Sequence, residues 1–121
     1  MTKRNVKNNV FPLLINGDVW KIGFYTSKAF DKKHADATDA LGIMDDEKML
    51  VDFKIEHFKR HIALHEITHA YESYLCLGDV DNVTPDQLSE LMAKFFEKNF
   101  EKLRRTVNQI MRLYRSVNGK L

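Results

Sequence analysis

Cysteine is nearly absent from this sequence, which has a single one, Cys76, among 121 residues. One cysteine excludes an internal disulfide and agrees with a reducing compartment. The sequence has no run of eighteen apolar residues, so hydropathy predicts no membrane-spanning helix. An apolar segment followed by small residues, the mark of a secretory signal, is missing from the N-terminus. We therefore expect a soluble, cytoplasmic protein whose stability comes from packing.

Proline and glycine are also scarce, with two and five residues. Neither interrupts residues 56–77, which predict a helix that ends at Gly78. A last helix is predicted from Thr84, which can cap it, because Pro85 suits a first turn and Gln87 can complete a capping box. It runs to about residue 116. Its apolar residues repeat at spacings of four and three, the pattern of a helix packed along another helix: Phe96, Phe100, Leu103, Val107, Ile110 and Tyr114.

Short apolar stretches predict two strand pairs. Residues 13–15 and 19–25 flank Asn16-Gly17-Asp18, and Asn-Gly accepts the positive φ of a tight hairpin turn. Residues 41–44 and 49–53 flank a second, acidic turn, and a short helix is expected around residues 28–32. The sequence thus predicts an α+β fold. A small antiparallel sheet of about four strands packs on the helix 56–77, and a long C-terminal helix follows.

The chain divides into a flexible basic leader, residues 1–9, and one domain, residues 10–121. The net charge of +2 is unevenly distributed, since residues 1–30 sum to +4, 31–97 to −8 and 98–120 to +6. Such asymmetry favours a charged partner, and the alternative is a solvated helix face with a disordered arm. The sequence has no helix-turn-helix or aromatic-interleaved basic patch, which argues against direct nucleic-acid binding.

The motif with chemical meaning is His65-Glu66-Ile67-Thr68-His69, which has the H-E-x-x-H form. Residues four apart lie one above the other on a helix, so both imidazoles can reach one zinc ion. Glu66 would then face a metal-bound water, from which it can take a proton. On a helical wheel the apolar residues lie opposite the two histidines: Ala63, Leu64, Ile67, Ala70, Tyr71, Tyr74, Leu75 and Leu77.

A third zinc ligand must come from elsewhere in the chain. Glu90 is our choice, because it lies in the first turns of the last helix and Ala93 would let that helix approach closely. On the wheel, however, Glu90 falls well off the apolar stripe. The alternatives lie near the motif or in the loop that follows it: Glu72, Asp79, Asp81 and Asp86.

His57 and His61 extend the row of histidines upstream, but one zinc ion cannot use all four. We expect His61 to contact the ligands or solvent, and His57 to be solvated. We expect Cys76 to be buried or to lie beside the ligands, because a thiolate would need another turn of helix to reach the metal.

In several segments the sequence resembles the small phage-encoded relatives of the IrrE/ImmA-type zinc metallopeptidases. These are Gly42 ahead of an acidic turn, a strand that ends at Val51-Asp52, the helix 63–71 with its histidines, and the downstream segment 90–96. The likeness covers about residues 40–100 and implies a Zn²⁺ cofactor bound by His65, His69 and Glu90. In the family a Glu followed by Ala and Phe supplies the third ligand. Ile62 and Glu97 depart from the family pattern and leave peptidase activity open.

Two functions follow from this interpretation. The first is a phage anti-CRISPR protein that inhibits Cas9, a class that the resemblance suggests, with zinc as a structural staple and an acidic surface facing the basic channel of the host protein. Such a protein would be a monomer, or a homodimer through its C-terminal helix. The alternative is a zinc-dependent peptidase with Glu66 as general base, in which an edge strand from 41–53 aligns the substrate.

Overall fold

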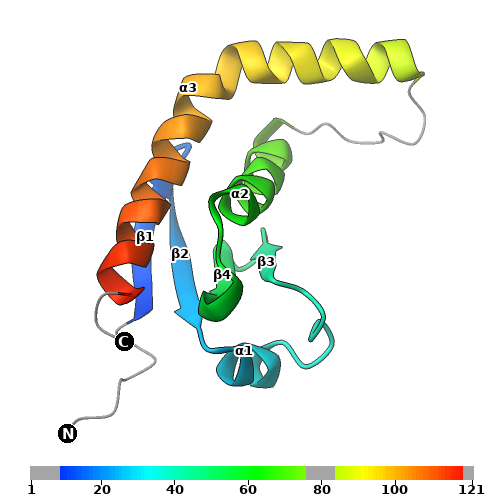
Figure 1. Cartoon of the computed structure of the whole chain (residues 1–121). Coiled ribbons are helices and arrows are strands. Elements are labelled where there is room, and N and C mark those ends of the chain that lie inside the picture. The colour runs from blue at the N-terminus through cyan, green and yellow to red at the C-terminus, as the bar shows by residue number, and fades with distance from the viewer. Residues whose placement is uncertain (1–8, 76–83, 119–121) are drawn as a thin grey trace, which may run out of the picture.

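The computed structural model describes residues 9–75 and 84–118, with the backbone alone for residues 72–75. Residues 1–8 of the expected leader and the expected helix stop at Gly78 lie outside the described residues. The elements in chain order are β1 (Val10–Ile15), β2 (Asp18–Tyr25), α1 (Ser27–Lys33), β3 (Gly42–Asp45), β4 (Leu50–Lys54), a 3₁₀ turn η2 (Ile55–His57), α2 (Arg60–Leu75) and α3 (Pro85–Asn118). The fold is α+β, with one four-stranded sheet and a long C-terminal helix (Figure 1).

Both predicted hairpins are present. Asn16 and Gly17 have φ of 54° and 91°, and a two-residue turn between strands needs positive φ at both positions. The expectation of an antiparallel sheet is wrong for one strand pair, β2 with β4, which we call the parallel seam. The strand order is β1-β2-β4-β3, and β2 pairs with β4 in parallel. The chain between them is long enough to contain α1, and parallel strands need such a connection.

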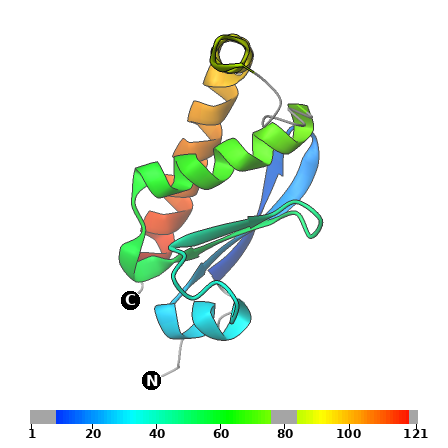
Figure 2. The same ribbon diagram turned by 90° about the vertical axis from the view of Figure 1, so that its right-hand side faces the viewer.

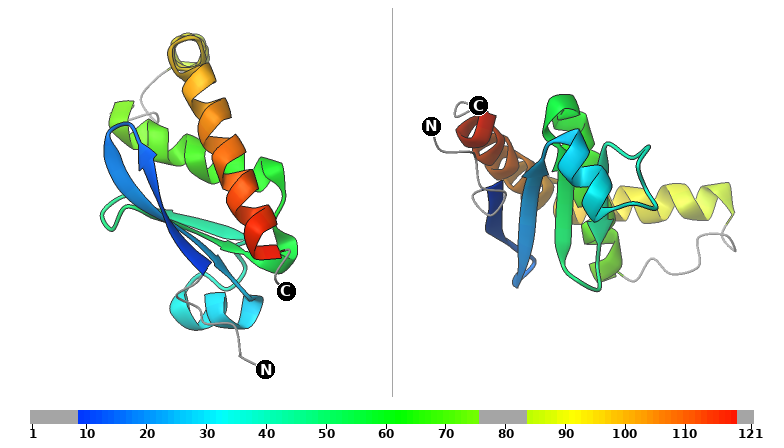
Figure 3. Two further views of the ribbon diagram at one scale, coloured as in Figure 1. Left: turned by 90° about the vertical axis from the view of Figure 1, so that its left-hand side faces the viewer. Right: turned by 90° about the horizontal axis from the view of Figure 1, so that it is seen from below.

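The two faces of the sheet differ in chemistry. Alternation along β4 points Val51 and Phe53 to one face, where they join the core with Ile67 of α2 and Ile110 of α3. Figure 2 and Figure 3 show α2 and the second half of α3 on this face. Asp52 and Lys54 point to the other face, and both are buried. Here α1 packs against β2 and β4.

Helix α2 begins at Arg60, four residues later than expected, because residues 55–57 form the separate turn η2. Its buried side carries Ile62, Ala63, Ile67 and Ala70. Leu64, which the sequence placed on the apolar side, is 44% exposed, so that assignment is wrong. Ile62 and Glu66, two residues before and after Leu64, are buried instead. The buried face of α2 is therefore rotated toward these two residues.

Helix α3 begins with the predicted capping box. Thr84 N–H donates to Gln87 Oε1 at 2.9 Å, and Gln87 N–H donates to Thr84 Oγ1 at 3.1 Å. The helix bends, so that its first half extends past the sheet and its second half runs along it (Figure 1). Asn99 and Thr106 bond to the carbonyls four residues earlier, a pattern that bends helices.

Only part of the predicted apolar stripe of α3 is buried. Leu103, Val107 and Ile110 lie in the core, as expected. Phe96 and Phe100 are 43% and 56% exposed, whereas Phe95 and Asn99 are buried, so the buried flank of this part of the helix is rotated away from the predicted stripe. Within the described ranges, no helix is both long and apolar enough to cross a membrane.

Candidate metal centre

Helix α2 presents His65 and His69 on its outer face, one turn apart. Their Nε2 atoms lie 3.2 Å apart, and the two rings meet edge to face with centroids separated by 4.7 Å. Two nitrogens bound to one zinc ion at tetrahedral geometry would be separated by roughly 3.3–3.4 Å, given Zn–N bonds of about 2.0–2.1 Å. The separation in the structure is that of a hydrogen bond between the two rings, and it is close to the spacing of two ligands of a tetrahedral zinc ion.

Glu66 lies on the buried side of the same helix, between the two histidines in sequence. Its side chain is 11% exposed, and its Oε2 atom lies 3.9 Å from Nε2 of His65. Burial raises the pKa of this carboxyl, while the charges of His65 and His69 act in the opposite direction. The carboxylate is thus held close to the histidine pair in a partly dehydrated position.

A cavity of about 350 Å³ opens beside Glu66. Its walls come from α2, through Ile62 and His65, and from Leu41 and Gly42, where the chain enters β3. A Cβ on Gly42 would lie 3.1 Å from Glu66 Cγ, so a glycine lets α2 approach β3 closely here. Because β3 is the last strand in the order β1-β2-β4-β3, the cavity lies at an edge of the sheet.

Glu90, the predicted third ligand, is not gathered with the histidines. Its side chain is 67% exposed and forms an ion pair of 3.8 Å with Lys94. On the helical wheel it lies opposite the face of α3 that carries Phe95 and Leu103, both buried. Among the residues that the structure describes, no three His, Cys, Asp or Glu side chains are grouped to hold a metal ion.

The other candidate ligands are distributed as follows. Asp86 lies in the first turn of α3 and is exposed. Asp79, Asp81 and Cys76 lie outside the described residues, and so does the side chain of Glu72. His61 is exposed and lines the cavity beside Glu66. His57 belongs to η2 rather than to α2, so it does not extend the histidine row.

A second polar cluster, on the opposite face of the sheet, was missed by the sequence analysis. The carboxylate of Asp52 is 2% exposed, and its Oδ2 atom lies 2.7 Å from His34 Nε2 and 2.9 Å from Lys33 Nζ. A Cβ on Gly23 would lie 2.5 Å from Asp52 Oδ1, so the neighbouring strand leaves room for this carboxylate. Polar residues at alternate positions of β4, Asp52 and Lys54, were the available signal.

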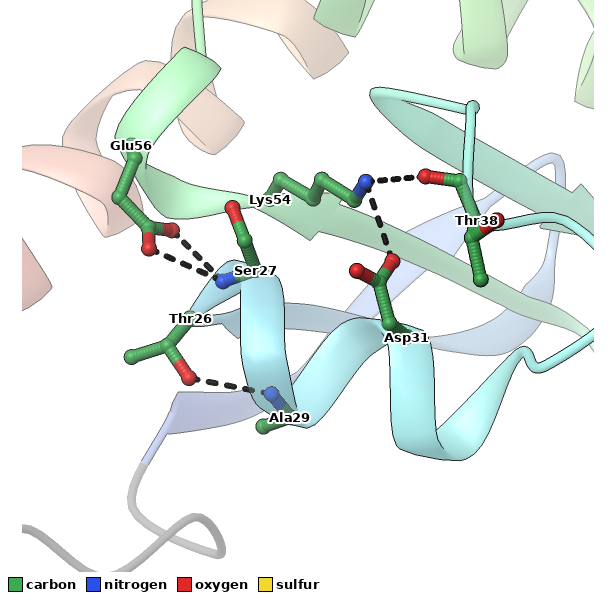
Figure 4. Close-up of polar contacts among 7 residues, drawn as sticks. All are labelled: Thr26, Ser27, Ala29, Asp31, Thr38, Lys54 and Glu56. Carbon is green, nitrogen blue, oxygen red and sulfur yellow. Dashed lines mark hydrogen bonds and ion pairs between the residues drawn. The ribbon is translucent and has the colours of Figure 1, made fainter.

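Lys54 connects this cluster to the segment that forms the cavity wall. Its ammonium group is 3.1 Å from Asp31 Oδ1 and donates to the Thr38 carbonyl (Figure 4). Its backbone N–H donates to the Leu41 carbonyl at 3.0 Å. Its side chain is 8% exposed. One buried lysine thus holds both ends of residues 38–41, which lead directly into β3 and the Glu66 cavity.

Comparison with known proteins gives no further assignment. No family model, no curated protein and no solved structure matches the chain. Function is therefore inferred from the geometry of the site.

Proposed function

We propose that the protein is a zinc-dependent peptidase in which His65 and His69 hold one Zn²⁺ ion and Glu66 is the general base. The observation that carries this proposal is the 3.2 Å separation of the two Nε2 atoms, with the Glu66 carboxylate beside them. The bound ion would polarise the scissile carbonyl and make a water molecule acidic enough to attack it near pH 7. Glu66 would accept the proton of that water and pass it to the leaving amine.

The neighbouring strand supports a peptide as the substrate. β3 pairs with β4 on one side only and lies at the edge of the sheet, next to the cavity. An extended peptide that adds to such an edge makes main-chain hydrogen bonds along its length. Leu41 and Ile62 would offer an apolar wall to a side chain of that peptide.

The third zinc ligand is proposed from the sequence alone, which favours Glu90. Glu90 would have to reach the histidine pair by a rotation or shift of the first half of α3, the part that extends past the sheet (Figure 1). Glu72 and the acidic residues of the segment before α3 are the alternatives. One ligand from any of these positions completes the three that a catalytic zinc site has, with one position left for water.

The second proposal, an inhibitor of Cas9 with zinc as a structural staple, has weaker geometric support. His65 and His69 belong to one helix, and a metal ion held by these two alone would connect no second element. His65 is also 66% exposed. Structural zinc sites are closed and four-coordinate, whereas an exposed pair beside a cavity suits a catalytic site. We therefore place the peptidase first.

The experiment is a cleavage assay with purified, zinc-loaded protein and a pool of quenched fluorescent peptides. Glu66→Gln should keep the zinc content and lower cleavage by about 10² or more, since a general base contributes about that much. His65→Ala should lose both metal and activity. Full cleavage by Glu66→Gln, or no metal in the wild-type protein purified without chelator, would refute the proposal. Zinc binding without cleavage, combined with capture of Cas9, would favour the inhibitor.

A further inference from the structure

One flank of α3 carries positive charge over most of its length. At 100° per residue, five exposed cations fall within about 80° of arc. We call this set the α3 basic stripe: Lys94, Lys98, Lys102, Arg105 and Arg112. From Lys94 to Arg112 the path along the axis of α3 is about 27 Å, and this path includes the bend of the helix (Figure 1). The stripe is therefore a narrow, bent cationic surface on the outside of the protein.

Little in the described part of the chain neutralises the stripe. Lys94 forms a long ion pair of 3.8 Å with Glu90, and the other four cations form none with described residues. The nearest acidic residue of this part of α3, Glu101, lies about 20° outside this arc and pairs with Arg104 at 3.2 Å. The positive charge of the stripe is thus available to an external anion.

A hollow at the middle of the stripe adds further hydrogen-bond donors. It has a volume of about 440 Å³ and lies between α3 and the turn that joins β1 to β2. Lys102, Arg105 and Gln109 line it from the helix, and Asn16 and Gly17 line it from the turn. Cations with amide groups around them are the side chains that commonly contact phosphate oxygens.

From these observations we infer that the α3 basic stripe binds the phosphate backbone of double-stranded nucleic acid. The part of the stripe on the second half of α3, from Lys102 to Arg112, is about 15 Å long and spans roughly four base pairs at 3.4 Å each. The centre of a protein–protein interface is enriched in aromatic residues and depleted in lysine. The stripe has the opposite composition, since it contains three lysines and no aromatic residue. The missing base-reading motifs argue against recognition of sequence and leave contacts to phosphate unaffected. This inference is independent of the peptidase proposal.

The test measures binding of the full-length protein to a fluorescent 20-base-pair DNA duplex of arbitrary sequence, between 50 and 200 mM salt. With about four phosphate contacts, the plot of log K against log salt should have a slope near −3.6, so affinity should fall about 10²-fold over this range. No binding at 50 mM salt would overturn the inference. So would equal competition by polyglutamate, which would indicate an acidic protein as the partner.

A matched pair of variants locates the contact. Lys102→Glu with Arg105→Glu reverses two charges of the stripe, and Arg104→Glu with Arg115→Glu makes the same change of net charge about 120° away around the helix. All four side chains are exposed, and circular dichroism will check that both proteins are folded. The first variant should lose at least tenfold more affinity than the second. Equal losses would show that net charge alone attracts the duplex, and would overturn the assignment to the stripe.

Discussion

The Oδ2 atom of Asp52 lies 2.7 Å from Nε2 of His34, on the face of the sheet that α1 covers. The same oxygen is 2.9 Å from Lys33 Nζ, and Lys33 also donates to the Tyr25 hydroxyl at 3.1 Å. Burial alone would lower the pKa of Lys33, but its hydrogen bonds to Asp52 and Tyr25 raise it on balance. The carboxylate thus ties the last turn of α1 to the middle of the sheet.

Asp52→Asn should therefore destabilise the protein. The variant removes the negative charge that His34 and Lys33 share, and we expect a loss of about 2 kcal/mol of unfolding free energy, because both partners are partly solvated. Denaturant unfolding followed by circular dichroism measures it. Asp46→Asn, at an exposed position of the turn between β3 and β4, is the control and should change stability by less than about 0.5 kcal/mol. Equal stability of the two variants would show that the buried carboxylate contributes nothing.

Glu56 should make stability depend on pH in the acid range. Partial burial would raise the pKa of Glu56, but the hydrogen bonds that its carboxylate accepts from Ser27 N–H, at 2.8 and 3.0 Å, lower it on balance (Figure 4). A carboxyl with a lowered pKa stabilises the fold above its ordinary value of 4.5, and this stabilisation disappears as pH falls through the lowered pKa.

The variant Glu56→Gln isolates this contribution. At pH 7 it should be less stable than the wild-type protein by no more than about 1 kcal/mol, since the carboxylate is well solvated. The difference should shrink as pH falls below 4.5 and vanish once pH lies below the lowered pKa of Glu56. Melting curves from pH 3 to pH 7 measure it, with Glu47→Gln as an exposed control. A difference that stays constant down to pH 3 would contradict the assignment.

Lys54→Met should loosen the wall of the Glu66 cavity. Methionine keeps most of the buried stem but removes the ammonium group that contacts Asp31 and the Thr38 carbonyl. We expect a loss of about 1.5–3 kcal/mol and faster amide hydrogen exchange in residues 38–42. Lys48→Met, at an exposed lysine, is the control. Unchanged exchange in residues 38–42 of the Lys54 variant would show that the backbone bond to Leu41 suffices to hold this segment.

The choice of third zinc ligand is tested by competition with a chelator. If Glu90 completes the site, Glu90→Gln should lose zinc at a much lower chelator concentration than Glu72→Gln, because removal of one of three protein ligands weakens the site directly. A faster loss in Glu72→Gln would move the ligand to α2. Equal and unchanged retention in both would point to the loop before α3, where Asp79 and Asp81 are the next variants to test.

Local features of the fold could be predicted because neighbouring residues determine them. The positive φ values of Asn16 and Gly17, and the reciprocal bonds of Thr84 and Gln87, depend on residues within one turn. The parallel seam could not be predicted, since an alternating strand looks the same next to either kind of partner. The exposure of Phe96 could not be predicted either, because the helix has the right period and only the tertiary structure shows that the flank with Phe95 and Asn99 is the buried one.

In the candidate site, too, local features could be predicted and contacts between distant parts of the chain could not. The spacing of His65 and His69 follows from one turn of helix, and the structure has their nitrogens close together. Asp52 and Lys54 alternate along β4 and so mark a polar face, but the burial of that face depends on α1, which is distant in sequence. Whether Glu90 belongs to the site stays a prediction.

The parallel seam between β2 and β4 also affects how the protein folds. Each hairpin can form from contacts between near neighbours, on a timescale of about 1–10 μs. The seam pairs Lys21 with Leu50 and Tyr25 with Lys54, so it closes only after a long loop has been ordered. In a refolding experiment with pulsed hydrogen exchange, we expect amides in both hairpin turns to be protected before those that cross the seam. The apolar edges of β2 and β4 are exposed in that interval, which makes it the stage at which the chain is most prone to aggregate.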